Sequence, residues 1–143
     1  MQLRQGTTAD WPAVRDLLVR ANLPVDGAEK AFETGLVAVE NDRVVGCAAI
    51  ETYNATALLR SVAVTLDRQG SGVGTSLVHA AEALARTTGA NAMILLTETA
   101  EPWFERLGYG PIEREAAPDD IASSVEFVTA CSETAIAMRR SLE

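Results

Sequence analysis

A glycine-rich turn carries the clearest chemical signal in this 143-residue sequence. It reads Gln69-Gly-Ser-Gly-Val-Gly74, and it separates the apolar run 61–64 from a segment with helical periodicity that extends to about Thr88. Glycines allow a tight turn and a close approach of ligand to backbone, and the free N–H groups at a helix start attract anions. The turn therefore predicts a pyrophosphate cradle that needs no lysine. The alternative is a turn that only starts a helix.

Two other phosphate-binding motifs fit this turn poorly. A Walker-type loop requires Gly-Lys-Ser/Thr, and the turn contains no lysine. A Rossmann turn follows the first strand of a larger sheet, with an acidic ribose ligand about twenty residues later. Here the turn follows the third or fourth expected strand, and the remaining chain is too short for a doubly wound sheet. Both motifs are therefore set aside.

Three charged residues near the ends of expected strands are candidates for substrate binding or proton handling. Arg60 lies in an otherwise apolar strand, on the face that strand alternation also gives to Val62 and Val64. Such an arginine either binds a carboxylate or oxyanion, or forms an internal salt bridge. Glu51 is a candidate for holding a substrate ammonium group or accepting its proton, and Glu98 is the third candidate.

The elements that must position these residues alternate between strands and helices. The expected strands are 2–5, 36–40, 43–52, 57–64, 92–97, 112–114 and 134–140. The expected helices begin at Thr7 or Thr8, cover 28–33, run from the glycine turn to about Thr88, cover 100–107, and begin at Pro118. Asn41-Asp42 signals a hairpin, and the strand–glycine turn–helix–strand order signals a crossover. We therefore expect one mixed α/β domain over residues 1–143.

The glycine turn and its context resemble the GCN5-related N-acetyltransferase (GNAT) family, and the resemblance covers essentially the whole sequence. Gln69, Gly72 and Gly74 match the family motif Gln/Arg-x-x-Gly-x-Gly/Ala, and residues 103–109 resemble its Phe-Tyr-x-x-x-Gly-Phe segment. The resemblance implies a mostly antiparallel sheet with helices on both faces and a splayed central strand pair that holds acetyl-CoA. It also implies these cofactor-binding residues: Val62, Ala63, Val64, Gln69, Gly70, Ser71, Gly72, Val73, Gly74, Thr75, Trp103 and Phe104.

A narrower resemblance bears on the substrate. Residues 95–104 look like the acetyltransferase domain of N-acetylglutamate synthases, and residues 58–64 like small acetyltransferases encoded with arsenic-resistance genes. Glu98 stands where those synthases have an arginine. Phe104 stands where many family members have a thiolate-protonating tyrosine, and Tyr109 is expected to be a packed ring.

These resemblances imply an acetyl-CoA-dependent enzyme that acetylates the primary amine of a small molecule. The expected acceptor is an amino acid or an amino-acid analogue, either glutamate-like or arsenic-containing. Two alternatives are acetylation of a protein or peptide N-terminus and a non-catalytic acyl-CoA-binding regulatory module. Small relatives often pair through sheet edges, so a homodimer is one expected assembly.

The composition argues against several classes of partner. Twenty acidic and twelve basic residues give a formal net charge of -8, so we expect no nucleic-acid partner and no attachment to an anionic membrane. No apolar stretch approaches eighteen residues, which favours a cytoplasmic location. Neither cysteine, Cys47 or Cys131, shares a metal-ligand spacing with the single histidine, His79, so no metal is expected.

Overall fold

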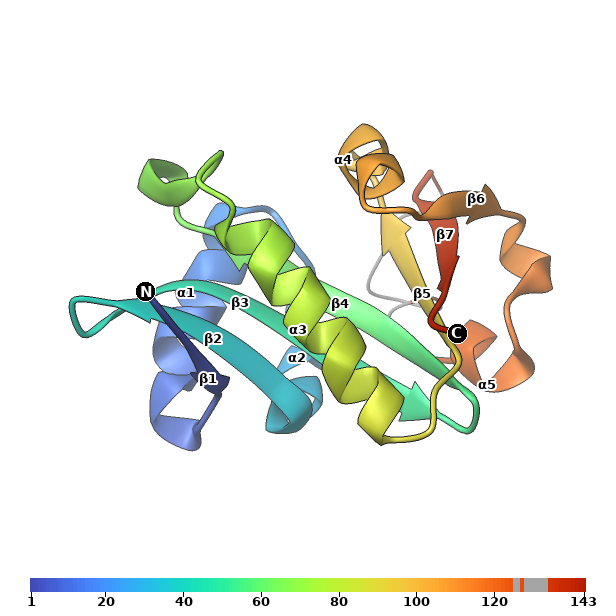
Figure 1. The fold of residues 1–143 in the computed structure, drawn as a ribbon, viewed down its shortest axis with the longest axis horizontal. Coiled ribbons are helices and arrows are strands. Elements are labelled where there is room, and N and C mark those ends of the chain that lie inside the picture. The colour runs from blue at the N-terminus through green and yellow to red at the C-terminus, as the bar shows by residue number, and fades with distance from the viewer. Residues whose placement is uncertain (125–126, 128–133) are drawn as a thin grey trace.

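In the computed structural model, which describes residues 1–124, 127 and 134–143, seven strands form one mixed sheet (Figure 1). Their order across the sheet is β1-β2-β3-β4-β5-β7-β6. Neighbouring strands are antiparallel except for β4 and β5, which are parallel. The strands are β1 (Gln2–Gln5), β2 (Gly35–Glu40), β3 (Arg43–Tyr53), β4 (Thr56–Val64), β5 (Ala92–Thr97), β6 (Gly110–Ile112) and β7 (Ile136–Ser141).

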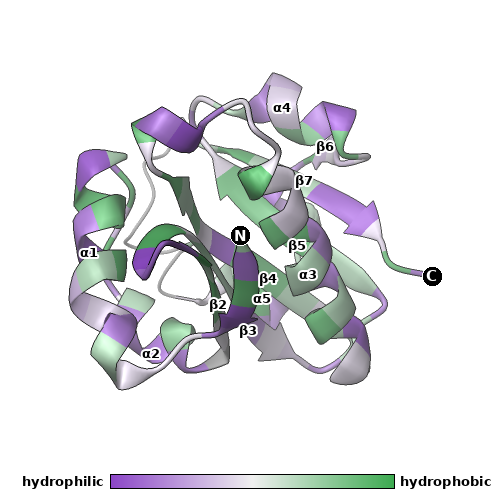
Figure 2. Ribbon diagram, turned by 60° about the vertical axis from the view of Figure 1, so that its left-hand side comes forward, coloured by the Kyte–Doolittle hydropathy of each residue, from purple (hydrophilic) through white to green (hydrophobic). Residues whose placement is uncertain are grey.

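Helices cover both faces of this sheet (Figure 2). The long helix α3 (Val73–Thr87) packs on one face with α4 (Glu101–Arg106) beside it. The opposite face carries α1 (Trp11–Arg20) and α2 (Ala28–Ala31), and α5 (Asp119–Ala122) packs against β4 and β5. The mixed, mostly antiparallel sheet with helices on both faces is thus confirmed.

The apolar stripe of α3 explains how that helix is placed. Val73, Leu77, Ala81 and Ala85 recur every four residues, and all four are buried against the sheet. Small alanines in this stripe let the helix approach the strands closely. His79 lies on the exposed side of the same helix.

The β2–β3 hairpin forms where the sequence signals it. Asn41 and Asp42 have φ angles of 52° and 61°, the left-handed conformation that a two-residue hairpin turn with the correct twist requires. Asparagine and aspartate tolerate this conformation better than most residues. The local signal therefore predicts the turn without tertiary information.

Several expected boundaries were wrong by a few residues: the strand expected over 134–140 is β7, and the helix expected from Thr7 or Thr8 starts with a 3-10 turn before α1. Two other differences have a local cause. The strand expected over 112–114 is β6, at Gly110–Ile112, because Arg114 starts a short 3-10 turn instead. The helix expected over 28–33 ends at Ala31 and continues as the 3-10 turn Phe32–Thr34. Both differences occur where a helical turn tightens or a strand loses its pairing partner.

The described residues also bear on a membrane-spanning helix, a metal site and the cysteines. In the described part of the chain, no helix is both long and apolar enough to cross a bilayer. Over the same residues, no group of His, Cys, Asp and Glu side chains has the arrangement of a metal site. Cys47 is buried in β3, and this burial raises the pKa of its thiol to about 12. Cys131 lies outside the described residues.

Candidate active site

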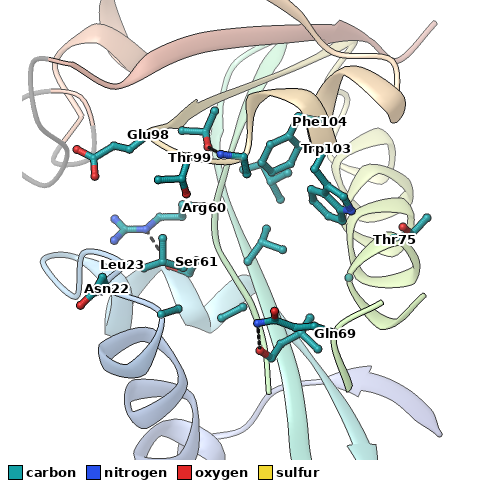
Figure 3. Close-up of a pocket in the computed structure, with 18 of the residues that line it drawn as sticks. Asn22, Leu23, Arg60, Ser61, Gln69, Thr75, Glu98, Thr99, Trp103 and Phe104 are labelled. Carbon is teal, nitrogen blue, oxygen red and sulfur yellow. Dashed lines mark hydrogen bonds between the residues drawn. The ribbon is translucent and has the colours of Figure 1, made fainter. Parts of the chain in front are cut away.

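Strands β4 and β5 separate beyond a short region of pairing. They pair from Thr56 to Leu58 and from Ala92 to Ile94, after which β4 stays with β3 and β5 stays with β7. A cavity of about 950 Å³ opens where the two strands diverge. Figure 3 shows side chains from both strands, from the segment after α1, from the glycine turn and from α4 around this space. The splayed central pair expected from the sequence is present.

A β-bulge interrupts β4 at the wall of the cavity. Ser61 and Val62 together oppose the single residue Ala48 of β3. Ser61 has a φ angle of 61°, a left-handed conformation that costs an ordinary residue about 1–2 kcal/mol. Bulges re-aim the backbone of a strand, and this one lies beside the segment 62–64 that is expected to bind the acetyl donor.

The bulge makes the expected alternation of β4 wrong. Val62 and Val64 pack with the core on the α3 side of the sheet, whereas Ala63 packs with the core on the α1 side. Arg60 shares its face with Ala63, because the one additional residue at Ser61 reverses the sides of the residues that follow. The arginine and the two valines therefore lie on opposite faces.

The glycine turn lies at one end of the cavity, directly before α3. Gly70 and Gly72 have φ angles of 81° and 91°, and a Cβ atom at either position would extend into open space. Gly74 has a different role, because a Cβ atom there would lie 3.1 Å from the Trp103 ring. The side-chain amide of Gln69 donates a hydrogen bond to the Val64 carbonyl at 3.2 Å and so ties the turn to β4.

Backbone N–H groups are available at this end for an anionic ligand. The first N–H groups of α3 have no partner within the helix, since the helical ladder starts with the bond from Ser76 N–H to the Gly72 carbonyl. No side chain caps this helix start in the described residues. The positive end of the helix dipole adds to the attraction. The turn can therefore hold a phosphate without a lysine.

Arg60 lies further along the cavity and is buried. It donates from Nη1 to Glu51 Oε2 at 3.2 Å, from Nη2 to the Asp26 carbonyl at 2.8 Å, and from Nε to Ser61 Oγ at 3.2 Å. The Tyr53 hydroxyl donates to the other oxygen of Glu51. Burial, and then this bond, raise the pKa of Tyr53. Arg60 thus forms an internal salt bridge while also lining the cavity.

Polar groups surround Arg60 at this second end of the cavity (Figure 3). Glu98 follows β5, is exposed, and is the one carboxylate among the described residues that line the cavity. Thr97 Oγ accepts a hydrogen bond from the Ala100 N–H at 3.0 Å, which orders the start of α4. Asn22, after α1, lies on the other side of Arg60. This end is therefore suited to a polar, charged ligand.

Aromatic rings close the cavity on the side of α4. The centroid of Phe104 lies 4.8 Å from that of Trp103 and 5.6 Å from that of Tyr109, with both pairs in edge-to-face arrangements. The Tyr109 hydroxyl is buried and donates to Glu82 at 2.8 Å, and burial followed by this bond raises its pKa. Tyr109 is a packed ring, and Phe104 has no proton to donate.

The structure brings most of the predicted residues to this cavity. The predicted residues that line it are Arg60, Val62, Ala63, Val64, Gln69, Gly70, Gly72, Gly74, Thr75, Glu98, Trp103 and Phe104. Glu51, Ser71 and Val73 are not among the lining residues. Glu51 reaches the site only through Arg60, and Val73 is turned into the core beneath the glycine turn.

Several residues that line the cavity were not predicted from the sequence, among them Asn22, Leu23, Arg68 and Arg106. The segment that contains Asn22 reads only as the end of a helix, and nothing in its spacing shows which part of the molecule it approaches. Arg68 directly precedes the glycine motif, so its charge was a usable signal. Arg106 carries no local signal beyond its type.

Comparison with known proteins identifies a domain family. The family model described as "Acetyltransferase (GNAT) domain" matches residues 31–111, more than half of the chain. An uncharacterized N-acetyltransferase of Chlorobaculum tepidum is 38% identical over 86 residues, which are 59% of this chain and 55% of that protein. An amino-acid acetyltransferase of Ralstonia nicotianae is 32% identical over 85 residues, 57% of this chain and 19% of that protein. The alignments thus span about half and about a fifth of these relatives.

Solved structures share the fold at low sequence identity. The N-acetylglutamate synthase of Neisseria gonorrhoeae, complexed with coenzyme A and N-acetyl-glutamate, superposes with a TM-score of 0.86 at 18% identity over 99% of this chain and 35% of that chain. The Mycobacterium tuberculosis protein Rv2747, in complex with CoA, superposes with a TM-score of 0.84 at 23% identity over the full length of both chains.

Proposed function

This chain belongs to the GNAT family of acetyl-CoA-dependent N-acetyltransferases, and we propose that its acceptor is the primary amine of an amino acid or amino-acid analogue with an anionic side chain. The observation that carries the proposal is a single cavity with two chemically different ends. Unpaired backbone amides lie at one end, and Arg60 and Glu98 lie at the other. Glutamate-like and arsenic-containing analogues are the acceptors to test first.

The residues at the glycine turn fit the acetyl donor. A Cβ at Gly72 would occupy the open space in front of the α3 amides, where a pyrophosphate would bind. Val62 and Val64 line the cavity, and their backbone groups would hold the pantetheine arm. Acetyl-CoA supplies an activated thioester, and the protein positions that group.

At the other end, charge complementarity supports an acceptor with both an anionic and an amino group. The Arg60 guanidinium would attract a carboxylate or another oxyanion. The Glu98 carboxylate would hold the acceptor ammonium group and take up its proton, since attack on a carbonyl requires the neutral amine. Glu51 would act indirectly, by holding Arg60 in place.

The proposed proton handling differs from that of family members with a tyrosine at position 104. Phe104 cannot protonate a leaving thiolate, so water in the open cavity would relay that proton. A strand amide near Val62 or Ala63 would hold the thioester oxygen, and proximity of the two reactants would supply most of the acceleration.

A panel assay tests the proposal. Purified protein is mixed with acetyl-CoA and single acceptors, and CoA release is followed by liquid chromatography. The panel contains glutamate, arginine, arsenic- and phosphorus-containing glutamate analogues, and peptides with free N-termini. We expect turnover on at least one free amino acid or analogue with an anionic side chain.

The other outcomes would contradict the proposal in different ways. Turnover on peptides alone would support N-terminal acetylation of proteins. Thermal stabilisation by acetyl-CoA without any turnover would support a non-catalytic acyl-CoA-binding module.

A homodimer also remains a prediction, and sedimentation of the purified chain measures it directly.

A further inference from the structure

Three arginines line the cavity, and they differ in their partners. Arg60 forms an ion pair with Glu51, and Arg68 forms ion pairs with Glu40 and Asp67. Arg106, the last residue of α4, is exposed and has no hydrogen-bond or ion-pair partner among the described residues. Its charge is thus the one not already neutralised by a neighbouring carboxylate.

Helix α4 relates Arg106 to the glycine turn through Trp103. Trp103 lies against Gly74, so close that a Cβ atom there would be 3.1 Å from the ring. Arg106 follows Trp103 by three residues, which places the two side chains on the same face of the helix. Both line the same cavity. Arg106 therefore lies on the face of α4 that carries Trp103, in the cavity that also contains the glycine turn.

The negative net charge of the chain explains why a cationic side chain in the cavity matters for binding an anionic ligand. The net charge is -8, so an anionic ligand is repelled by most of the surface and needs a local positive group. The backbone amides at the glycine turn can bind only those phosphates that lie within hydrogen-bond distance of them. A cationic side chain at the rim would attract a second phosphate of the same ligand that lies outside this turn.

We infer that Arg106 binds the ribose 3′-phosphate of CoA and lets the protein discriminate CoA from its 3′-dephospho form. This inference rests on the proposed use of acetyl-CoA. The guanidinium pairs with phosphate oxygens through charge-assisted hydrogen bonds. Arg68 is the competing residue, but its guanidinium would have to leave Glu40, to which it donates from both Nε and Nη2.

Binding measurements with two nucleotides test the role of Arg106. Calorimetry gives the Kd of CoA and of 3′-dephospho-CoA for the unmodified protein and for Arg106→Gln. We expect the unmodified protein to prefer CoA by about three- to tenfold, as for one exposed charge-assisted contact. In Arg106→Gln the ratio should fall to about one, with the Kd of 3′-dephospho-CoA unchanged.

Two further variants test whether the preference for CoA depends on Arg106 specifically. Arg15→Gln, on the exposed side of α1, changes the net charge equally and should keep the preference for CoA. Arg68→Gln should also keep it, and a loss of the preference in Arg68→Gln alone would overturn the assignment to Arg106. Equal weakening of both nucleotides by Arg106→Gln would overturn it as well. If the unmodified protein binds neither nucleotide, the proposed function itself fails.

Discussion

Arg60 Nη1 donates a hydrogen bond to Glu51 Oε2 at 3.2 Å, although the Arg60 side chain is fully buried and that of Glu51 is 19% exposed. The two residues are diagonal neighbours across β3 and β4, since Arg60 pairs with Ala49. Arg60 lines the cavity and Glu51 does not, so the ion pair couples the stability of the sheet to the position of a charge at the cavity.

Arg60→Ala should destabilise the protein by about 2–4 kcal/mol, because it leaves the Glu51 carboxylate in a largely buried site without its partner. Urea denaturation measures the loss. The double variant Arg60→Ala, Glu51→Ala should lose less than the sum of the two single variants. Strict additivity in that cycle would show that the ion pair contributes nothing.

The same arginine should affect acceptor binding. In Arg60→Ala, measured at a temperature where the variant stays folded, the KM for acceptors with an anionic side chain should rise about tenfold or more. The KM for acetyl-CoA should stay within about twofold, because the donor is expected to bind mainly at the other end of the cavity. Unchanged KM values for every acceptor would remove Arg60 from the acceptor site.

Gly72→Val should abolish CoA binding, because a side chain would enter the space in front of the α3 amides. Gly89→Val is the matched control. Both glycines have a φ angle of 91° and open space around a Cβ atom, so the strain of substitution is similar at both ends of α3. Calorimetry should find CoA binding in Gly89→Val alone. Loss of binding in both variants would point to a general effect on the fold.

Glu98→Gln should lower kcat by about 10- to 100-fold, since an amide cannot take up the proton of the acceptor amine. Glu105→Gln, an exposed residue of α4 outside the cavity lining, changes the net charge equally and should leave kcat unchanged. Steady-state kinetics on an accepted amine separates the two variants. If both retain full activity, Glu98 handles no proton.

Asp10 makes the stability of the N-terminal region dependent on pH. It accepts hydrogen bonds from the Arg4 guanidinium at 2.7 and 2.9 Å and from the Thr7 N–H at 2.8 Å. The hydrogen bonds from Arg4 are the largest cause that lowers the pKa of Asp10 to about 2. Since this pKa lies below its ordinary value, Asp10 stabilises the fold at neutral pH, and the contribution is lost as the pH falls from about 4 to 2.

Asp10→Asn should therefore be less stable than the unmodified protein by about 1–2 kcal/mol at pH 7, and the difference should shrink toward pH 2. Urea denaturation at pH 7, 4 and 2.5 measures it. A difference that stays constant over this range would contradict the proposed ionisation.

Sequence alone determined the features that depend on local chemistry. Glycines at positions 70, 72 and 74, with an apolar stripe following, specify a turn into a helix whose first amides are free to accept an anionic ligand. Residues 41 and 42 likewise specify their hairpin. These features form within a few residues, so neighbouring positions contain the information.

Tertiary structure alone decided which residues meet across the cavity. The bulge at Ser61 arises from pairing between β3 and β4, and it places Val62 and Val64 on the face opposite to Arg60, contrary to the expected alternation. The contact of Arg60 with the Asp26 carbonyl, and the packing of Trp103 against Gly74, join segments that are distant in the chain. Such contacts depend on how layers pack against one another, and local periodicity and spacing carry no information about a distant partner.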